Sequence, residues 1–305
     1  MTNYPDLPSS QLWISEEVAH ALRDHKPVVA LESTVITHGL PYPQNLKLAR
    51  DMEHEVRAQG ATPATIGMVD GRVCVGLQAD QLEQLAQAPS VRKISSRDFA
   101  PAMVQGASGG TTVAGTLIAA HRVGIQVFAT GGIGGVHREA PFDVSTDLKQ
   151  LSTTPVVVVC AGAKAILDLP ATLETLETLG VPVLGYQTDD FPAFYSRSSG
   201  LAVSARADSP AEVAAVAKAH WALGLSSAIL VTQPPPEADA LPAEQIEKSI
   251  AQALREAQAQ SIHGQAVSPF LLRRVSELSG GASLKANLAL LLNNARLAGQ
   301  IACFM

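Results

Sequence analysis

Short apolar runs that alternate with stretches of helical character constrain the fold of this chain more than any other feature. The runs are Pro27 to Leu31, Ile125 to Ala129, Val156 to Cys160, Val181 to Tyr186 and Ala228 to Val231. Continuous apolar runs of this length are typical of strands that are buried on both faces of a sheet. We therefore expect an α/β fold in which helices on both faces cover a mixed, largely parallel sheet.

Further local signals add a helix, a hairpin and a helical C-terminal section. Asn45 to Gln59 is predicted to be a helix, and the Asp70-Gly71 pair between two apolar runs predicts a tight antiparallel turn. Pro242 to Gln260 and Ser268 to Met305 have helical character, and no Gly/Ser-rich or charged linker separates them from the rest. We expect one domain over residues 1–305, with residues 1–10 as a loose tail.

Composition excludes several classes of protein. The 305 residues carry a formal net charge of -6, whereas proteins that bind nucleic-acid polymers usually present a basic face. Cys74, Cys160 and Cys303 are odd in number and lack CxxC spacing, which indicates a reducing compartment. The polar start does not resemble a signal peptide, and no apolar run reaches the roughly 20 residues that span a bilayer. We expect a cytoplasmic protein without membrane or nucleic-acid partners.

Polar residues follow several apolar runs, where an α/β sheet places its binding crevice. Glu32 follows the first run, the glycine loop Thr130 to His137 follows the second, and Lys164 follows the third. Lys93 comes shortly after Val91. Because the carboxyl ends of parallel strands meet at one edge, we expect these groups to converge.

Each of these groups also has an ordinary structural interpretation. Glu32 could be a solvated loop carboxylate, and most lysines are solvated surface groups. A lysine beside a packed strand such as Lys164 can instead lose hydration, favour its neutral amine and become a nucleophile. The loop from Thr130 to His137 only partly imitates GxGxxG; its glycines suit a cradle for phosphate or sugar, or simply a tight turn.

Three other polar groups are candidates for ligand binding. Thr111 and Thr112 open a predicted helix, Thr111 to Val123, whose first amides suit either an anion or ordinary capping by a hydroxyl. Asp143 and Asp147 suit a magnesium or manganese ion if water or substrate completes the shell, although helix capping explains them equally well.

The third group consists of asparagines. Asn287 and Asn293-Asn294 lie in an otherwise apolar predicted helix. A buried amide costs about 1 to 3 kcal/mol unless it is hydrogen-bonded. Base recognition or a polar contact between subunits would each satisfy them.

Taken together, these segments resemble the pseudouridine-5'-phosphate glycosidase family. The matching strings run in order and spacing from about Ile14 to Ala302. They are Val28 to Gly39 (VVALESTVITHG), Pro41 to Asn45 (PYPQN), Thr130 to His137, Asp143 to Leu148, Val158 to Lys164 (VVCAGAK), Leu176 to Thr178 and Phe191 to Tyr195 (FPAFY). Strings over nearly the whole chain are far more specific than a lone motif.

The resemblance implies reversible cleavage of a carbon–carbon glycosidic bond, in which pseudouridine 5'-phosphate gives uracil and ribose 5-phosphate. Lys164 matches the family's Schiff-base lysine, Glu32 its proton donor and Asp143 the carboxylate that binds Mn2+. The matching substrate-binding residues are Lys93, Val113, Ser145, Thr146 and Asp147, with Asn287 as an amide near uracil. We add Thr112, Thr130 and His137 as candidate substrate-binding residues. The family also implies a homotrimer.

The chain departs from the family pattern in two places. Ser95-Ser96-Arg97-Asp98 stands where the family usually has Ser-Arg-Arg-Asp, and the Ala140-Pro141-Phe142 lead-in to Asp143 is short. These departures concern loop geometry and phosphate contacts. Two other functions remain open: an indigoidine synthase A-like enzyme that acts on another compound, and a non-catalytic sugar-phosphate-binding protein.

Overall fold

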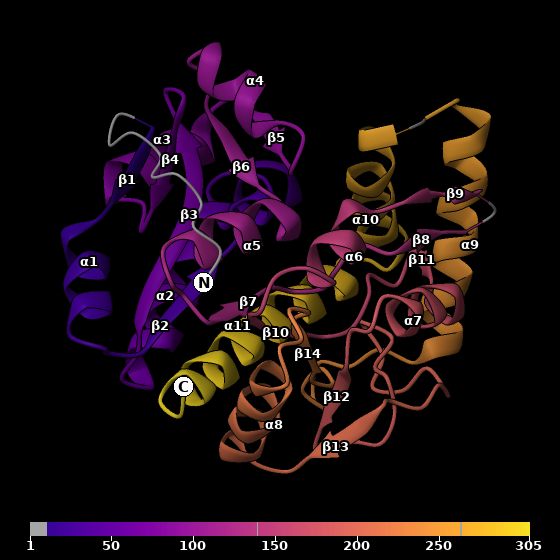
Figure 1. The fold of residues 1–305 in the computed structure, drawn as a ribbon. Helices are drawn as coiled ribbons and strands as arrows, with labels where there is room; N and C mark the ends of the chain where they lie inside the picture. The colour runs from indigo at the N-terminus through magenta and orange to yellow at the C-terminus, as the bar shows by residue number, and fades with distance from the viewer. Residues whose placement is uncertain (1–10, 139, 263) are drawn as a thin grey trace.

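The computed structural model describes residues 11–138, 140–262 and 264–305 (Figure 1). The expected N-terminal tail, residues 1–10, lies outside them. The strands are β1 (Leu12–Ile14), β2 (Val28–Leu31), β3 (Thr62–Val69), β4 (Arg72–Val75), β5 (Arg92–Ile94), β6 (Gly109–Thr111), β7 (Val127–Ala129), β8 (Val136–His137), β9 (Ala140–Val144), β10 (Val157–Cys160), β11 (Leu167–Asp168), β12 (Val183–Tyr186), β13 (Ala205–Ala207) and β14 (Ile229–Thr232).

Helices connect and follow these strands. They are α1 (Glu16–Arg23), a π-helical turn (Val35–Gly39), α2 (Gln44–Ala58), α3 (Ala79–Gln87), α4 (Phe99–Val104), α5 (Val113–Arg122), α6 (Thr146–Leu151), α7 (Leu169–Thr178), α8 (Pro210–Ala222), α9 (Ala243–Ala259), a 3-10 turn (Gly264–Ala266), α10 (Val267–Leu278) and α11 (Ala282–Ala302). Among the described residues, no helix is both long and apolar enough to span a bilayer.

One large mixed sheet organises the molecule. Its order is β1-β4-β3-β2-β7-β10-β14-β12-β13, with β6 beside β3 and β5 beside β6. The pairings from β3 through β2 to β13 are parallel, whereas β3 pairs with β4 and β6 in antiparallel fashion. A second sheet of three short strands, in the order β11-β8-β9, lies apart from the main sheet. The expected mixed, largely parallel sheet in a single domain is confirmed.

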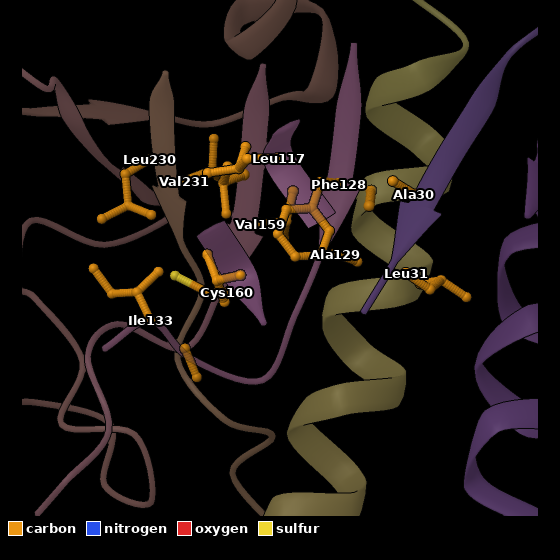
Figure 2. Close-up of a cluster of buried hydrophobic side chains, with 14 of the residues drawn as sticks. Ala30, Leu31, Leu117, Phe128, Ala129, Ile133, Val159, Cys160, Leu230 and Val231 are labelled. Carbon is orange, nitrogen blue, oxygen red and sulfur yellow. The ribbon is translucent and has the colours of Figure 1, made fainter. Parts of the chain in front are cut away.

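Helices cover the sheet on both faces. The long helix α11 packs across β2, β7 and β10 together with α2 and α8, while α5 and α6 pack against each other on the other face. The central strands are apolar on both sides, because each of their faces meets a helix. Figure 2 shows this core, in which Phe128, Val159 and Leu230 come from three neighbouring strands and are fully buried.

The sequence predictions of elements hold with two differences. The hairpin of β3 and β4 forms around Asp70-Gly71, where both residues have positive φ. The helix expected from Thr111 begins only at Val113, because Thr111 belongs to β6 and Thr112 is the N-cap that accepts a hydrogen bond from the Gly115 amide. The polar residues Glu32, Ser33 and Thr34 after β2 lead directly into a π-helical turn, Val35–Gly39, and not into a longer open loop.

Candidate active site

A cavity of about 400 Å³ lies at the carboxyl ends of β2, β7 and β10, where the sequence predicted the crevice. Nearly all the predicted site residues line it. They are Glu32, Lys93, Thr112, Val113, His137, Asp143, Ser145, Thr146, Asp147, Lys164 and Asn287. Thr130 is fully buried behind this lining and reaches the site only through Glu32.

Glu32 is held at the end of β2 by two hydroxyl groups. Its side chain is only 7% exposed, so it is not the solvated loop carboxylate that the sequence left open. The Thr130 hydroxyl donates to Oε1, and the Thr34 hydroxyl contacts Oε2. These contacts fix both carboxyl oxygens while the group still lines the cavity.

The Thr34 hydroxyl suits a carboxyl group that gains and loses a proton. Its oxygen lies within hydrogen-bond reach of Glu32 Oε2 and, at 2.8 Å, of the Thr111 carbonyl oxygen. A hydroxyl has one proton to donate and lone pairs that accept. When Glu32 is ionised, Thr34 donates to it; when Glu32 is protonated, Thr34 accepts from it and donates to Thr111. The Thr34 hydroxyl thus stays hydrogen-bonded to Glu32 in both protonation states, and it donates to the Thr111 carbonyl only when Glu32 is protonated.

Lys164 follows β10 on a tightly held backbone. Its amide donates to the Ile133 carbonyl at 3.1 Å, so the glycine loop after β7 and the segment after β10 continue side by side beyond the sheet. Gly162 makes this possible, because it has a φ of 88° and a Cβ there would lie 2.5 Å from the Pro192 carbonyl oxygen. The half-buried Lys164 side chain thus enters the cavity from a rigid support.

Lys93, on β5, faces the same cavity as Lys164. Burial lowers the pKa of Lys93 and the positive charge of Lys164 lowers it further, whereas Asp147, Glu32 and Asp98 oppose the shift. Two amino groups close enough to influence each other favour a bound anion between them.

Two histidines share this environment. Burial lowers the pKa of His137 on β8, and Lys164 and Lys93 add to that effect while Asp143 opposes it. His38, at the end of the π-helical turn, also lines the cavity, and burial and Lys93 lower its pKa. Both imidazoles therefore favour their neutral form, in which they can donate and accept hydrogen bonds.

Asp147 ties three elements together beneath the cavity. The side chain is buried; its Oδ1 accepts from the Ala114 amide at 2.9 Å and its Oδ2 from the Gly134 amide at 2.8 Å. The start of α5, which the sequence offered as an anion site, thus already holds the protein's own carboxylate. With Thr112 as the N-cap, the capping interpretation of this helix start is confirmed.

Asp143 is the carboxylate that remains for a metal ion. It lies on β9, is exposed, lines the cavity and has no hydrogen bond or ion pair within the described part of the chain. Its neighbour in the expected pair, Asp147, already has both oxygens engaged by backbone amides. No cluster of three or more His, Cys, Asp or Glu side chains suited to a metal occurs among the described residues. One free carboxylate in a polar cavity fits a hard divalent ion that keeps most of its water.

Asn287 lines the cavity from α11, together with Leu291 one turn later. Asn294 continues the same helical face but is buried against the backbone at Thr130. Asn293 is half-buried on another face and lies outside the cavity lining.

Sequence reasoning missed several residues at the cavity. Thr34 and His38 lie inside the string VVALESTVITHG and could have been found there, since both carry polar groups just after a strand. Phe194 adopts a φ of 60°, unusual for a residue other than glycine, and its ring packs against Gly132, where a Cβ would lie 2.6 Å from the ring. Only the folded structure brings Phe194 to this loop.

A larger cavity of about 1160 Å³ lies elsewhere, between α1, α2 and α3. It is lined by Trp13, Arg50, Glu53 and Arg57 among others, and it shares no residue with the first cavity. None of the predicted site residues reaches it. The chemistry therefore belongs to the smaller cavity.

Comparisons with known proteins find relatives that match nearly the whole chain. The model of the family described as indigoidine synthase A like protein matches residues 17–304. The pseudouridine-5'-phosphate glycosidase of Paracoccus denitrificans is 57% identical over 96% of this chain and 97% of its own length, and that of Caldanaerobacter subterraneus is 52% identical over 95% of each.

Two solved structures share the fold. The prealnumycin C-glycosynthase AlnA, in complex with ribulose 5-phosphate, superposes with a TM-score of 0.89 at 44% identity and covers 97% of each chain. An indigoidine synthase A-like protein from Thermotoga maritima superposes with a TM-score of 0.90 at 35% identity and covers 98% of each.

Proposed function

Because the chain belongs to the indigoidine synthase A-like family, we propose that it is a pseudouridine-5'-phosphate glycosidase. The reaction is the reversible cleavage of pseudouridine 5'-phosphate to uracil and ribose 5-phosphate. The high identity to curated glycosidases supports the substrate, and the ribulose 5-phosphate bound to the AlnA neighbour supports a sugar-phosphate site in this fold.

The observation that carries the proposal is the convergence of Glu32, Lys93 and Lys164 on one cavity. A carboxyl group can supply a proton, an amine can form a covalent bond to a sugar carbon, and a second amine can hold a phosphate. A protein that only binds a sugar phosphate needs the last of these groups and not the first two. This distinction favours an enzyme over the non-catalytic alternative.

The proposed reaction begins at the Lys164 amine. Its nitrogen bonds to C1' of the ribose as the bond from C1' to the ring oxygen breaks and that oxygen takes a proton. Glu32 then donates a proton to C5 of uracil. The bond between C1' and C5 breaks, its electron pair stays with uracil, and the nitrogen lone pair forms a C1'=N iminium. Water hydrolyses the iminium, which frees Lys164 and releases ribose 5-phosphate.

The other residues that line the cavity hold the substrate during this reaction. Lys93 pairs with the phosphate, supported by Thr112, Ser145 and Thr146, and Asn287 presents its amide to uracil. Asp147 contributes indirectly, because its carboxylate fixes the start of α5 and the glycine loop. Asp143 would hold the divalent ion, proposed as Mn2+, whose charge would help to bind and orient an anionic substrate.

Release of uracil from pseudouridine 5'-phosphate and from pseudouridine, with and without Mn2+, tests this function. We expect the phosphorylated compound to have a kcat/KM at least about a hundredfold higher, because a phosphate paired with the cationic Lys93 and its hydroxyl neighbours contributes several kcal/mol. Asp143→Ala should lose Mn2+ and activity together. Absence of uracil release would contradict the proposal and favour another substrate; equal rates for the two compounds would remove the phosphate site.

A further inference from the structure

Asn294 places a polar amide in an otherwise apolar, buried part of the molecule. It is 1% exposed on the face of α11 that packs against the sheet, among buried Leu290, Leu291, Ala295 and Leu297. Its Oδ1 has no hydrogen-bond partner within the described part of the chain. A leucine would fill this place without leaving a polar atom unpaired. The amide must therefore serve a purpose that apolar packing does not.

The NH₂ group of the Asn294 amide, unlike its oxygen, has hydrogen-bond partners. Asn294 Nδ2 donates to the Thr130 carbonyl oxygen at 2.9 Å and lies 3.5 Å from the Gly131 carbonyl oxygen. Two carbonyl acceptors fix which end of the amide faces them, because only the NH₂ group can donate. Thr130 and Gly131 form the point where the chain leaves β7 and enters the glycine loop.

Thr130 transmits this anchoring to the cavity. Its amide donates to the Val159 carbonyl at 3.0 Å, so the residue is held from β10 through its nitrogen and from α11 through its oxygen. From this fixed backbone, its side-chain hydroxyl donates to Glu32 Oε1. Thr130 itself does not line the cavity.

We propose that Asn294 is a positioning residue for Glu32, acting through the Thr130 hydroxyl. This inference rests on the proposed function, in which Glu32 protonates the uracil carbon. Removing the amide donor releases the Thr130 backbone, and the hydroxyl no longer fixes the Glu32 carboxyl group. Cleavage of the C1'–C5 bond then slows, whereas imine formation between Lys164 and free ribose 5-phosphate, which needs no proton on uracil, does not; the Lys164 backbone is held by Ile133.

The test separates these two steps. Asn294→Leu keeps the branched arrangement of four side-chain heavy atoms and removes the donor, and Asn294→Asp keeps the shape of the side chain. We expect kcat for uracil release to fall about thirtyfold, which is ~2 kcal/mol, in each variant. KM should stay within about twofold, and borohydride trapping of ribose 5-phosphate on Lys164 should proceed within about threefold of the native rate.

Two further substitutions complete the design. Asn293→Ala, one residue earlier on the same helix, is the matched control, because its amide makes no hydrogen bond to a described residue, and it should leave kcat unchanged. Thr130→Val removes the hydroxyl and should reproduce the Asn294→Leu phenotype. The double variant should be no slower than either single one, because both substitutions break the same chain of contacts.

Several results would overturn the inference. The first is a native kcat in Asn294→Leu, and the second is an equal loss of borohydride trapping and of bond cleavage. The third is a double variant whose loss of kcat is the product of the two single losses. The fourth is a failure of both Asn294 variants to fold, which would make the residue purely structural. Absence of uracil release by the unsubstituted enzyme would overturn the proposed function instead. In that case a crystal structure of Asn294→Leu decides the inference: we expect the Thr130 hydroxyl to leave Glu32, and a retained contact would refute it.

Discussion

Lys93 illustrates how single residues set the behaviour of the cavity. Burial and the neighbouring charge of Lys164 both lower the pKa of Lys93, so its ammonium form is lost at a lower pH than that of an exposed lysine. Only the protonated form attracts phosphate. The enzyme therefore binds a phosphorylated substrate most tightly at a pH below the lowered pKa of Lys93, and this affinity declines as the pH rises through that pKa.

This sign leads to a prediction for KM. The KM for pseudouridine 5'-phosphate should rise with increasing pH, and the rise should begin at a lower pH than that at which a free lysine deprotonates. The KM for an unphosphorylated analogue should not change in this range. Lys93→Arg keeps its charge over the whole range, because a guanidinium does not deprotonate in proteins. The KM of the Lys93→Arg variant should therefore not change with pH. A KM of the native enzyme that does not change with pH would show that Lys93 does not bind the phosphate.

At the level of residues, the sequence could predict which groups face the cavity but not what holds them. Glu32 and Lys164 each follow a buried strand, which is enough to place them at one edge of the sheet. Besides the nearby Thr34 hydroxyl, Glu32 is oriented by Thr130, which lies 98 residues away in the sequence, and Thr130 is held by Asn294, a further 164 residues along the chain. Such contacts leave no local pattern. For the same reason, the sequence could not show that both carboxylate oxygens of Asp147 accept hydrogen bonds from backbone amides, which leaves them less suited to bind a metal ion.

Among the elements, the glycine loop after β7 and the start of α6 depend on each other. A Cβ on Gly134 would lie 2.3 Å from Ser145 Oγ and 2.8 Å from Asp147 Oδ2. Ser145 is the N-cap of α6, and Asp147 accepts from the Gly134 amide. The absence of a side chain at Gly134 thus allows the loop to lie directly against the residues that shape the cavity.

Gly134→Ala should disturb both stability and binding. Contacts this short force Ser145 and Asp147 to move, so we expect a loss of about 1–3 kcal/mol in the free energy of unfolding and a higher KM. Gly131→Ala, in the same loop, is the comparison, because its Cβ would meet the Leu291 and Leu290 side chains at the longer distances of 3.1 to 3.4 Å. Urea unfolding monitored by circular dichroism gives the stability. An equal effect of both substitutions would contradict the proposed coupling of loop and helix.

The elements themselves could be predicted well where one signal dominated. Apolar runs identified the central strands, and Asp70-Gly71 identified the hairpin. The start of α5 was placed two residues early, because Thr111 pairs in β6 and its hydroxyl donates to the Ile66 carbonyl. The short strands β8 and β9 pair with each other locally, and β11 pairs with β8 from about 30 residues further along the chain; no apolar run of residues announces them.

For the whole molecule, several large apolar side chains are exposed on the surface of the single chain. Val104 is 89% exposed, Phe142 99% and Leu223 79%. They lie in or beside three different elements, and single exposed apolar residues are common on protein surfaces, so these side chains do not define an interface by themselves. Sequence patterns within one chain could predict the α/β domain, whereas contacts between chains depend on surfaces that form only after folding.

We propose a homotrimer, as the resemblance to the glycosidase family implies. Cyclic association of identical chains of 31.9 kDa each predicts a single species of three times that mass. Light scattering coupled to size-exclusion chromatography measures it directly. A species with the mass of one chain, unchanged over a wide range of protein concentration, would refute the trimer.

The central claim is that Lys164 forms a covalent imine with the sugar, and borohydride trapping followed by peptide mapping tests it most directly. Reduction in the presence of ribose 5-phosphate should attach the sugar to Lys164 alone. Lys164→Arg keeps the charge but cannot form the same imine; we expect no adduct and a kcat lower by at least about a thousandfold, roughly 4 kcal/mol. An adduct on Lys93, or a near-normal kcat in Lys164→Arg, would contradict the proposed mechanism.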